Sequence, residues 1–470
     1  MTDNNASADD HSQPREIPPA GDASSNPEVP SAKHAHRSTL RISISWFFIV
    51  LTLTFSLIPL SRENKNNATS ITRDVRLELM GRYIVGIKYL LGNHSALNSS
   101  LKSMEPTLQK SENVENPILS IPILAELSGK EAALLELQRI AANPASDRIH
   151  RDILSFQQLY RYGASSLDSQ QRLDINRYGW LGRLALSQDK LAADPARKAI
   201  LQSALRTVVV MVILSIGTMT ALLAGLIMLT IAIVLKAKGR IRSHLKMPED
   251  PGTSLLEAFT IYLTGFIALP VFFLWLFPGH RFAAASLAIL AVIAALLWPR
   301  FRGSKAGNYR QAIGWYRGQG IFREIGSGIL GYIAGLPLLM VAAFFVWIIS
   351  RYTSGGMPAH PILYEINKGP LYLLLWTVLA CVWAPIVEEV FFRGILFGYF
   401  RRHLQWIAGG IFSALIFAII HPQGWIGVPL ITAVGFTLST IREWRGSIIA
   451  SISAHALNNG SALILLLALM

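Results

Sequence analysis

The chain has 470 residues, of which 51% are hydrophobic and only 15% are charged. This composition is too apolar for a water-soluble protein of this length, so most of the chain is expected to lie in a lipid bilayer. The formal net charge is +14, but the basic residues lie mostly in short runs between apolar stretches, as in cytoplasmic membrane loops. A nucleic-acid partner is therefore not expected, and the single cysteine excludes an internal disulfide.

The first part of the chain divides into three predicted segments. Residues 1–38 have few large apolar side chains, so we expect a disordered cytoplasmic tail. The apolar run in 39–61 lies far from Met1 and lacks a small-residue cleavage site, which indicates a transmembrane anchor helix and not a cleaved signal peptide. Residues 62–206 are polar with helical periodicity and predict a mainly helical domain in which no repeat recurs.

Eight more apolar stretches follow, each near the ~20 residues that cross the hydrocarbon layer as a helix. They are predicted at 207–235, 255–277, 283–298, 328–350, 370–398, 405–421, 426–440 and 447–469. Together with the anchor they predict an all-α fold, a polytopic membrane helical bundle of about nine transmembrane helices with a mainly helical extracytoplasmic domain. Residues 207–254 hold one span and a basic cytoplasmic loop, and 255–470 form the remaining membrane domain.

The basic loops also predict the orientation of the chain. The run KAKGRIRSHLK at 236–246, the segment 300–323 and the pair Arg401-Arg402 all follow spans that end on one side. Because lysine and arginine are retained in cytoplasmic loops, that side is the cytoplasm. The 62–206 domain and Met470 are then expected outside it.

Ionisable side chains cluster in the span PIVEEVFFRGILFGYF. A central charge in a transmembrane helix costs on the order of 2.5–3.5 kcal/mol, so it needs a partner or a function. Glu389 and Arg393 are four residues apart with the acid first, the favoured order for a structural ion pair. Glu388 lies on another face and stays free to take a proton from water. Pro385 cannot donate to the carbonyl of Cys381, so a kink or a free carbonyl is expected beside the site.

Two later apolar regions carry further polar groups. Phe417 and His421 are one helical turn apart, and Pro422 predicts that the histidine lies at a helix end. His455 and Asn459 are four residues apart and could both donate hydrogen bonds to an oxygen that becomes negative. Each residue alone is explained by packing or a helix–helix hydrogen bond. Their joint occurrence predicts a site that activates water.

The spacing of these groups resembles that of a known protease family. EEVFFR, FAIIH and HALNN match, in order, the Glu-Glu-x-x-x-Arg, Phe-x-x-x-His and His-x-x-x-Asn motifs of the CAAX prenyl protease and bacteriocin-processing (CPBP, or Abi) family of intramembrane proteases. The resemblance covers about 370–470 by motif and 255–470 by helix count. It implies an intramembrane endopeptidase, a hydrolase of the CAAX-box protein processing type, in the bacterial inner membrane.

The resemblance also implies the role of each motif residue. Glu388 and His421 would activate the attacking water, and His455 and Asn459 would form the oxyanion site. The substrate would be a membrane-associated or prenylated protein or peptide. No cofactor is certain. The family is often called a metalloendopeptidase, so zinc held by Glu388, His421 and His455 stays open, although the metal-free role is favoured because Asn459 has an obvious function beside an oxyanion.

Other functions fit less well. The main alternative is a non-catalytic membrane scaffold or partner-binding protein on the same fold. In such a protein the motif residues would be relics or would only form structural ion pairs. A transporter is disfavoured because no internal duplication of the helix pattern is seen. No His-Glu-x-x-His zinc helix and no Gly-x-Gly-Asp motif occurs in the sequence. The GSG at 326–328 is interpreted as close helix packing, not as a serine-protease loop.

Overall fold

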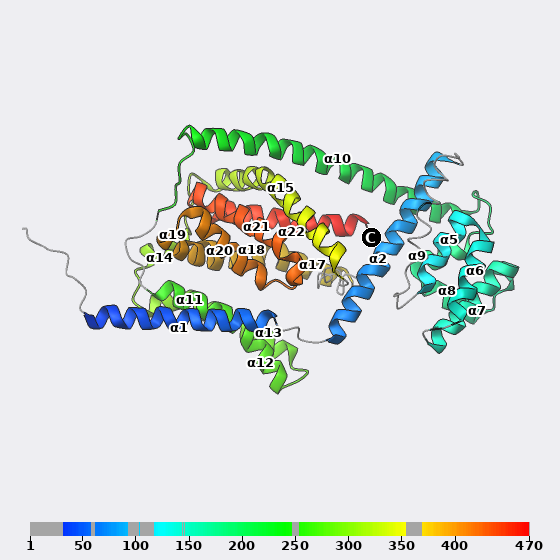
Figure 1. Ribbon diagram of the computed structural model, residues 1–470, viewed down its shortest axis with the longest axis horizontal. Helices are drawn as coiled ribbons and strands as arrows, with labels where there is room; N and C mark the ends of the chain where they lie inside the picture. The colour runs from blue at the N-terminus through cyan, green and yellow to red at the C-terminus, as the bar shows by residue number, and fades with distance from the viewer. Residues whose placement is uncertain are drawn as a thin grey trace, which may run out of the picture.

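The computed structural model describes residues 32–57, 62–92, 103, 117–142, 144, 146–246, 253–353 and 369–469. Across these ranges the regular structure is helical and contains no strand, which confirms the all-α fold class. Figure 1 shows long helices side by side in a bundle, with a smaller group of helices beyond one end of it. The chain is therefore a membrane bundle carrying a separate helical domain.

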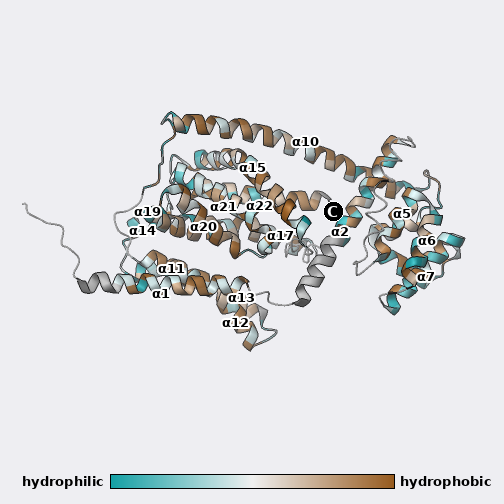
Figure 2. Cartoon of the chain, in the orientation of Figure 1, coloured by the Kyte–Doolittle hydropathy of each residue, from teal (hydrophilic) through white to brown (hydrophobic). Residues whose placement is uncertain are grey.

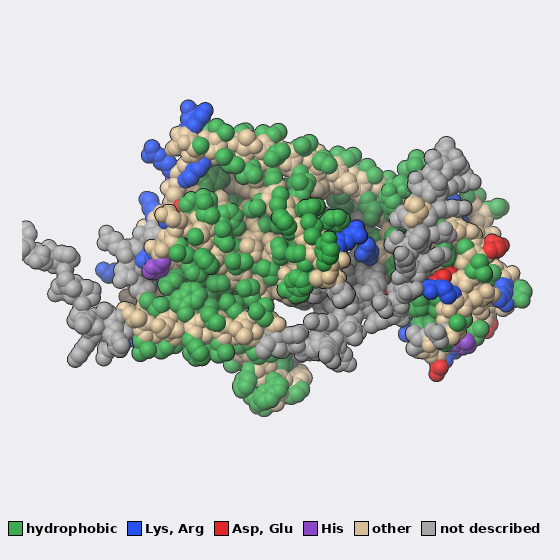
Figure 3. Space-filling view, viewed as in Figure 1, with side chains coloured by type: hydrophobic (Ala, Val, Ile, Leu, Met, Phe, Trp, Pro, Cys, Tyr) green, Lys and Arg blue, Asp and Glu red, His purple; other side chains and the backbone are tan. Residues whose placement is uncertain are grey.

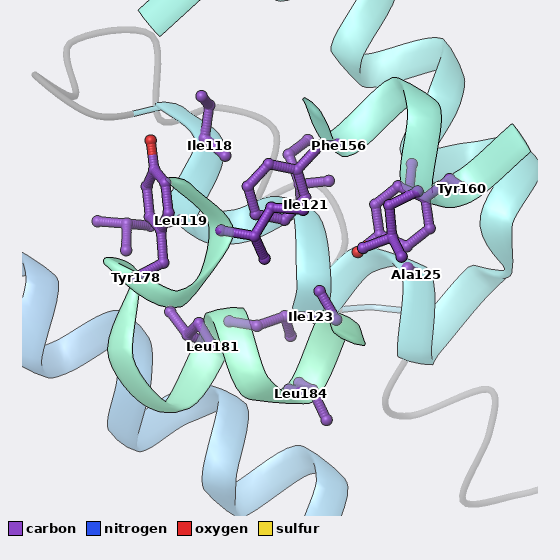
Figure 4. Close-up of a cluster of buried hydrophobic side chains, with 14 of the residues drawn as sticks. Ile118, Leu119, Ile121, Ile123, Ala125, Phe156, Tyr160, Tyr178, Leu181 and Leu184 are labelled. Atoms are coloured by element: carbon purple, nitrogen blue, oxygen red, sulfur yellow. The ribbon is translucent and has the colours of Figure 1, made fainter. Parts of the chain in front are cut away.

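The helical domain has its own hydrophobic core. Its helices are α2 (Arg62–Leu91), a 3-10 turn at Pro117–Ser120, α5 (Ile121–Ser128), α6 (Lys130–Ala141), α7 (Asp147–Tyr162), α8 (Ser169–Asn176) and α9 (Gly179–Leu186). Buried side chains such as Ile121, Phe156 and Leu181 converge between them (Figure 4). Side chains of α2 and of the first turns of α10 (Pro195–Ala237) complete this core. The domain is thus anchored on two helices that lead into the bundle.

Eight helices are long and apolar enough to cross a membrane among the described residues. They comprise α1 (Ala32–Leu57), α10, α11 (Ser254–Leu263) continued by a π-turn at Thr264–Ala268 and α12 (Leu269–Leu276), α13 (Arg281–Phe301), α15 (Ile321–Tyr352), the run Pro370–His403, α21 (Gly424–Arg445) and α22 (Ile448–Leu469). A short helix, α14 (Ala306–Ile313), precedes α15. Figure 2 shows that the bundle is predominantly hydrophobic. The protein is therefore a multi-pass membrane protein.

The ninth predicted span, 405–421, forms a shorter helix. Helix α20 (Trp406–Ile419) has 14 residues and measures about 21 Å, less than the ~30 Å hydrocarbon layer. It packs against α21 and against α19 (Phe397–His403). The two spans that looked shortest in sequence, 283–298 and 426–440, belong instead to helices of 21 and 22 residues.

Several boundaries differ from the sequence prediction because helices run on through polar flanks. Helix α1 begins at Ala32, inside the predicted tail, and residues 1–31 lie outside the described residues. Helix α10 is continuous for 43 residues, so the predicted border at 206 falls within one helix. A Cβ atom at Gly328 would overlap the carbonyl oxygen of Ala450, so this glycine of the GSG segment permits close packing of α15 on α22, whereas Gly326 has no neighbour within 4 Å of such an atom.

The charged loops gather at one end of the bundle. The end of α10, α14 and α19 lie together at that end, away from the helical domain (Figure 1). Lysine and arginine side chains are visible there in Figure 3, whereas the lateral surface is mainly hydrophobic. The helical domain and the end of α22 lie toward the opposite end. This arrangement agrees with the orientation predicted from the basic loops.

Candidate active site

The motif residues are carried by three neighbouring parts of the bundle. The run Pro370–His403 contains α17 (Pro370–Val378), a π-helix at Leu379–Trp383, α18 (Ala384–Glu388), a second π-helix at Glu389–Leu396, and α19. The turn after α20 and the middle of α22 face this run. A π-helix widens the turn and changes which residues share a face, and such segments are frequent at functional sites.

A buried ion pair lies at the centre of the site. Arg393 Nη1 donates to Glu389 Oε1 at 2.9 Å, and both side chains are fully enclosed. Arg393 Nη2 donates to the carbonyl of Gly435 at 3.2 Å on α21, and the guanidinium carbon lies 4.3 Å from the centre of the Phe417 ring. The charge of Arg393 is thus shared among a carboxylate, a carbonyl and an aromatic face. This arrangement compensates part of its desolvation.

His455 lies between the two glutamates. Its Nδ1 is 2.9 Å from Glu389 Oε1, and its Nε2 is 3.7 Å from Glu388 Oε2. Since Arg393 already donates to that oxygen of Glu389, the carboxylate acts as an acceptor, and Nδ1 of His455 carries the proton. In the neutral ring Nε2 therefore presents its lone pair toward Glu388. The sequence pattern did not indicate this contact, because Glu389 and His455 are 66 residues apart.

The two glutamates differ in their access to water. The side chain of Glu388 is 22% exposed, whereas that of Glu389 is 0% exposed. Glu389 is held by Arg393 and His455. Glu388 lies near the imidazole of His455, and it forms no ion pair with a lysine or arginine among the described residues. The carboxylate of Glu389 is therefore buried and structural, and that of Glu388 is accessible to water.

His421 lies in the turn that follows α20. The helix ends at Ile419, and His421 Nδ1 donates to the carbonyl of Phe417 at 2.6 Å, which leaves Nε2 free. The Phe417 ring centre lies 4.2 Å from that of His421 and 5.9 Å from that of His455. Glu388 is also close enough to act electrostatically on His421. The fold thus brings His421 and His455 to one aromatic ring, and Glu388 lies beside His455.

Asn459 closes the site from α22. Its Nδ2 donates to the carbonyl of Ala380 at 2.8 Å, and its Oδ1 accepts from Asn458 at 3.0 Å. In the π-helical register the partner of the Ala380 carbonyl would be the backbone nitrogen of residue 385, which is a proline without a hydrogen. The sequence prediction named the carbonyl of Cys381 from α-helical spacing, whereas the π-helical register points to the carbonyl of Ala380.

The residues proposed as zinc ligands do not form a ligand set in this arrangement. No group of three or more His, Cys, Asp or Glu side chains in the described part of the chain is placed to hold a metal ion. Each histidine keeps Nε2, the one nitrogen that a metal ligand needs, so the misfit lies in the placement of the three side chains and not in the ring nitrogens. The geometry does not fit a preformed three-ligand metal centre built from Glu388, His421 and His455.

Comparison with known proteins shows that part of this chain is similar to a known family. Residues 370–461 match the model of the Rce1-like group, described as type II CAAX prenyl endopeptidase Rce1-like. This segment is similar to that CAAX prenyl endopeptidase family. The match contains Glu388, His421, His455 and Asn459, so the four candidate catalytic residues all fall inside the matched segment. The helical domain and all the described helices before Pro370 lie outside the match.

Two Bacillus subtilis (strain 168) proteins are similar to the chain. "Putative membrane peptidase YdiL" is 29% identical over 140 residues, which cover 29% of this chain and 55% of that relative. "Uncharacterized protein YpbD" is 29% identical over 125 residues, which cover 26% of this chain and 59% of that relative. The chain thus spans little more than half of each curated relative. No solved structure matches it significantly.

Proposed function

We propose that the chain is an intramembrane endopeptidase of the CAAX protease type that hydrolyses peptide bonds of membrane-associated proteins or peptides. The observation that carries the proposal is the pairing of one sealed and one accessible glutamate on either side of His455. A purely structural ion pair needs Glu389 and Arg393 alone. It gives no reason for a second, accessible carboxylate 3.7 Å from a buried imidazole.

Glu388 is assigned the role of general base. Its partly exposed carboxylate can accept a hydrogen bond from water, and the Nε2 of His421, whose Nδ1 is already bonded to a carbonyl, would orient that water. Glu388 would take one proton as the water oxygen attacks the scissile carbonyl carbon, and it would return that proton to the leaving amine. Breakage of the C–N bond then releases the two peptide fragments.

His455 and Asn459 are assigned to the oxyanion. With Nδ1–H directed at Glu389, His455 donates from Nε2 only when the ring is doubly protonated, and the resulting charge then lies beside the Glu389 carboxylate. A buried acid that holds and stabilises a histidine in this way is a recurrent catalytic arrangement. Asn459 uses one Nδ2 hydrogen for Ala380 and keeps a second that can be directed at the oxyanion.

The placement of the site supports a substrate that approaches through the membrane. His421 follows a helix of only 14 residues, and irregular backbone at membrane depth is tolerated where protein or water surrounds it. We propose the bacterial inner membrane as the location and membrane-associated segments, prenylated or not, as the substrate class. The match to the prenyl endopeptidase family supports this assignment.

The decisive test is Glu388→Gln, which keeps the shape of the side chain but cannot accept a proton at neutral pH. Membranes that contain the wild-type chain or the variant are compared by mass spectrometry of newly formed protein N-termini. We expect a set of termini that the variant abolishes, a loss of about 10² to 10⁴ in rate for a removed general base. Glu131→Gln, an exposed change in the helical domain, serves as the matched control.

Two outcomes would contradict the proposal. Termini that persist in the Glu388→Gln membranes would remove Glu388 from the reaction. Membranes in which the wild-type chain produces no specific termini would instead favour a non-catalytic scaffold. The thermal unfolding midpoint of each purified protein checks that the variant is folded, because loss of activity through unfolding would appear there.

A further inference from the structure

A cavity lined mainly by polar and basic side chains lies at the basic end of the bundle, apart from the candidate active site. It has a volume of about 580 Å³. Its walls come from the segment after α10, from α14, from the loop before α15 and from the end of α21, and they include His244, Lys246, Arg310, Trp315, Tyr316 and Arg445. This volume falls in the range of ligand sites. None of the proposed catalytic residues lines the cavity.

The charge around this cavity is strongly unbalanced. Arg445 donates from Nε to Glu324 Oε2 at 3.0 Å and from Nη2 to Glu324 Oε1 at 2.6 Å, so the carboxylate nearest the cavity is already engaged. The backbone nitrogen of Gln319 also donates to Glu324. Lys246 and Arg310 are exposed, and no ion pair is recorded for either among the described residues. The cavity therefore presents free positive charge.

A buried arginine behind the wall adds to this field. Arg442 is 1% exposed and lies against Gly314, next to the wall residue Trp315. Its Nε and Nη1 have no hydrogen-bond partner within the described chain, and Nη2 reaches the Ala312 carbonyl at 3.4 Å. A buried cation with so few partners is costly and needs a counter-charge nearby. The nearest acid on α21, Glu443, is already paired with Arg401.

The cavity also has a group suited to a ligand hydroxyl. His244 Nδ1 lies 2.8 Å from the carbonyl of Trp444, so Nδ1 carries a hydrogen and Nε2 remains available. Apolar surface is also exposed at and after this wall: Trp315, which lines the cavity, is 42% exposed, and Ile321 and Phe322, which begin α15 just after the lining loop, are 45% and 90% exposed. Exposed aromatic side chains beside arginine and lysine are typical of the membrane–water boundary.

We propose that this cavity binds the phosphate group of an anionic ligand, with Lys246 and Arg310 as its direct partners. A phosphate diester of a lipid headgroup fits the apolar border, and a soluble phosphate ester shares the same chemistry. Basic pockets between membrane helices on the cytoplasmic side bind anionic headgroups by this combination of charge and adjoining apolar surface. The proposal does not depend on peptidase activity.

The same cavity is tied to the helix that carries His455. Tyr316 donates from its hydroxyl to the carbonyl of Gly446 at 2.6 Å, and Ser447 donates to the Tyr316 carbonyl at 2.7 Å. The backbone nitrogen of Ile448, the first residue of α22, donates to the carbonyl of Gly314. A ligand that orders this loop would therefore stabilise the start of α22, which predicts a higher thermal unfolding midpoint when the ligand is bound.

The test uses the full chain purified in a neutral detergent. Retention of added phosphatidylglycerol is measured by native mass spectrometry, with phosphatidylcholine as the neutral lipid and glycerol phosphate as the soluble competitor. The Lys246→Ala/Arg310→Ala variant is expected to bind phosphatidylglycerol roughly thirtyfold more weakly. The control, Lys305→Ala/Arg317→Ala, removes the same charge from exposed positions of the same loop outside the cavity wall.

Each outcome has a defined meaning. A lipid headgroup is supported if only the cavity variant loses phosphatidylglycerol and if glycerol phosphate does not displace phosphatidylglycerol from the wild-type chain. Equal competition by glycerol phosphate supports a soluble phosphate ester at the same site. Equal losses in the cavity variant and the control, or equal retention of phosphatidylcholine and phosphatidylglycerol, would overturn the proposal. Thermal unfolding without lipid shows that both variants are folded.

Discussion

At the scale of single residues, the candidate site depends on how a buried charge is distributed. Arg393 contacts the Glu389 carboxylate, the Gly435 carbonyl and the Phe417 ring. Glu389 in turn accepts from His455. Removing one member therefore leaves the other charges without compensation in a low-dielectric environment, which costs more than the intact pair contributes.

Arg393→Ala is predicted to destabilise the protein by about 3–5 kcal/mol, because Glu389 would remain as a buried charge without its partner. Folded yield and the thermal unfolding midpoint in detergent measure this effect. Arg351→Ala, at an exposed position on α15, is the control and should change neither quantity. Normal yield and stability of Arg393→Ala would show that the pair is solvated and that the buried arrangement is incorrect.

At the scale of helical elements, the π-helices change which backbone carbonyls lack a donor within the helix. The π-turn at Leu379–Trp383 shifts the hydrogen-bond register by one residue, and Pro385 then leaves the Ala380 carbonyl free. Asn459 supplies the missing donor from α22. A hydrogen bond of this kind links two membrane helices and contributes on the order of 1 kcal/mol.

This explanation predicts coupling between Asn459 and Pro385. Asn459→Ala should lower the free energy of unfolding by about 1 kcal/mol in the wild-type background. In a Pro385→Ala background the backbone nitrogen of residue 385 can donate along the helix, so the same change should cost much less. A double-mutant cycle with thermal or denaturant unfolding measures the difference. Equal costs in both backgrounds would show that Asn459 does not compensate for the proline.

At the scale of the whole molecule, the chain separates two ends with different properties. The basic loops and the phosphate cavity lie at one end, and the helical domain lies toward the other. Helix α10 has 43 residues, more than a bilayer span requires, so it extends from the helical domain to the basic end of the bundle. The candidate catalytic groups lie between these ends, on the helices of the C-terminal third.

This arrangement predicts the membrane topology. A reporter fused after Met470 should be detected outside the cytoplasm, and a reporter inserted after Lys246 should be detected in the cytoplasm, because basic loops are retained there. A pair such as alkaline phosphatase and green fluorescent protein gives opposite signals at the two positions. Signals on the same side at both positions would mean that α20, the shortest apolar helix of the membrane domain, does not reverse the chain direction.

The sequence alone determined the class of the protein and the identity of the motif residues. Apolar stretches of membrane length leave few choices but transmembrane helices, because backbone polar groups in lipid must be satisfied within the segment. Local spacing predicted that Glu389 and Arg393 share a helix face and that His421 lies at a helix end, since both depend on residues within one turn.

Only the tertiary structure decided how these residues meet. The contact of His455 with both glutamates joins helices 66 residues apart, and no local pattern encodes that pairing. The partner of Asn459 depends on the π-helical register at Leu379–Trp383. This register differs little in energy from an α-helix, so the packing of the surrounding helices selects it. The cavity proposed to bind phosphate is lined by residues from four separate segments. Its concentration of positive charge therefore depends on how the loops pack at one end of the bundle and cannot be predicted from any one segment. Local spacing determines faces and helix ends, whereas sites that depend on several helices follow from packing.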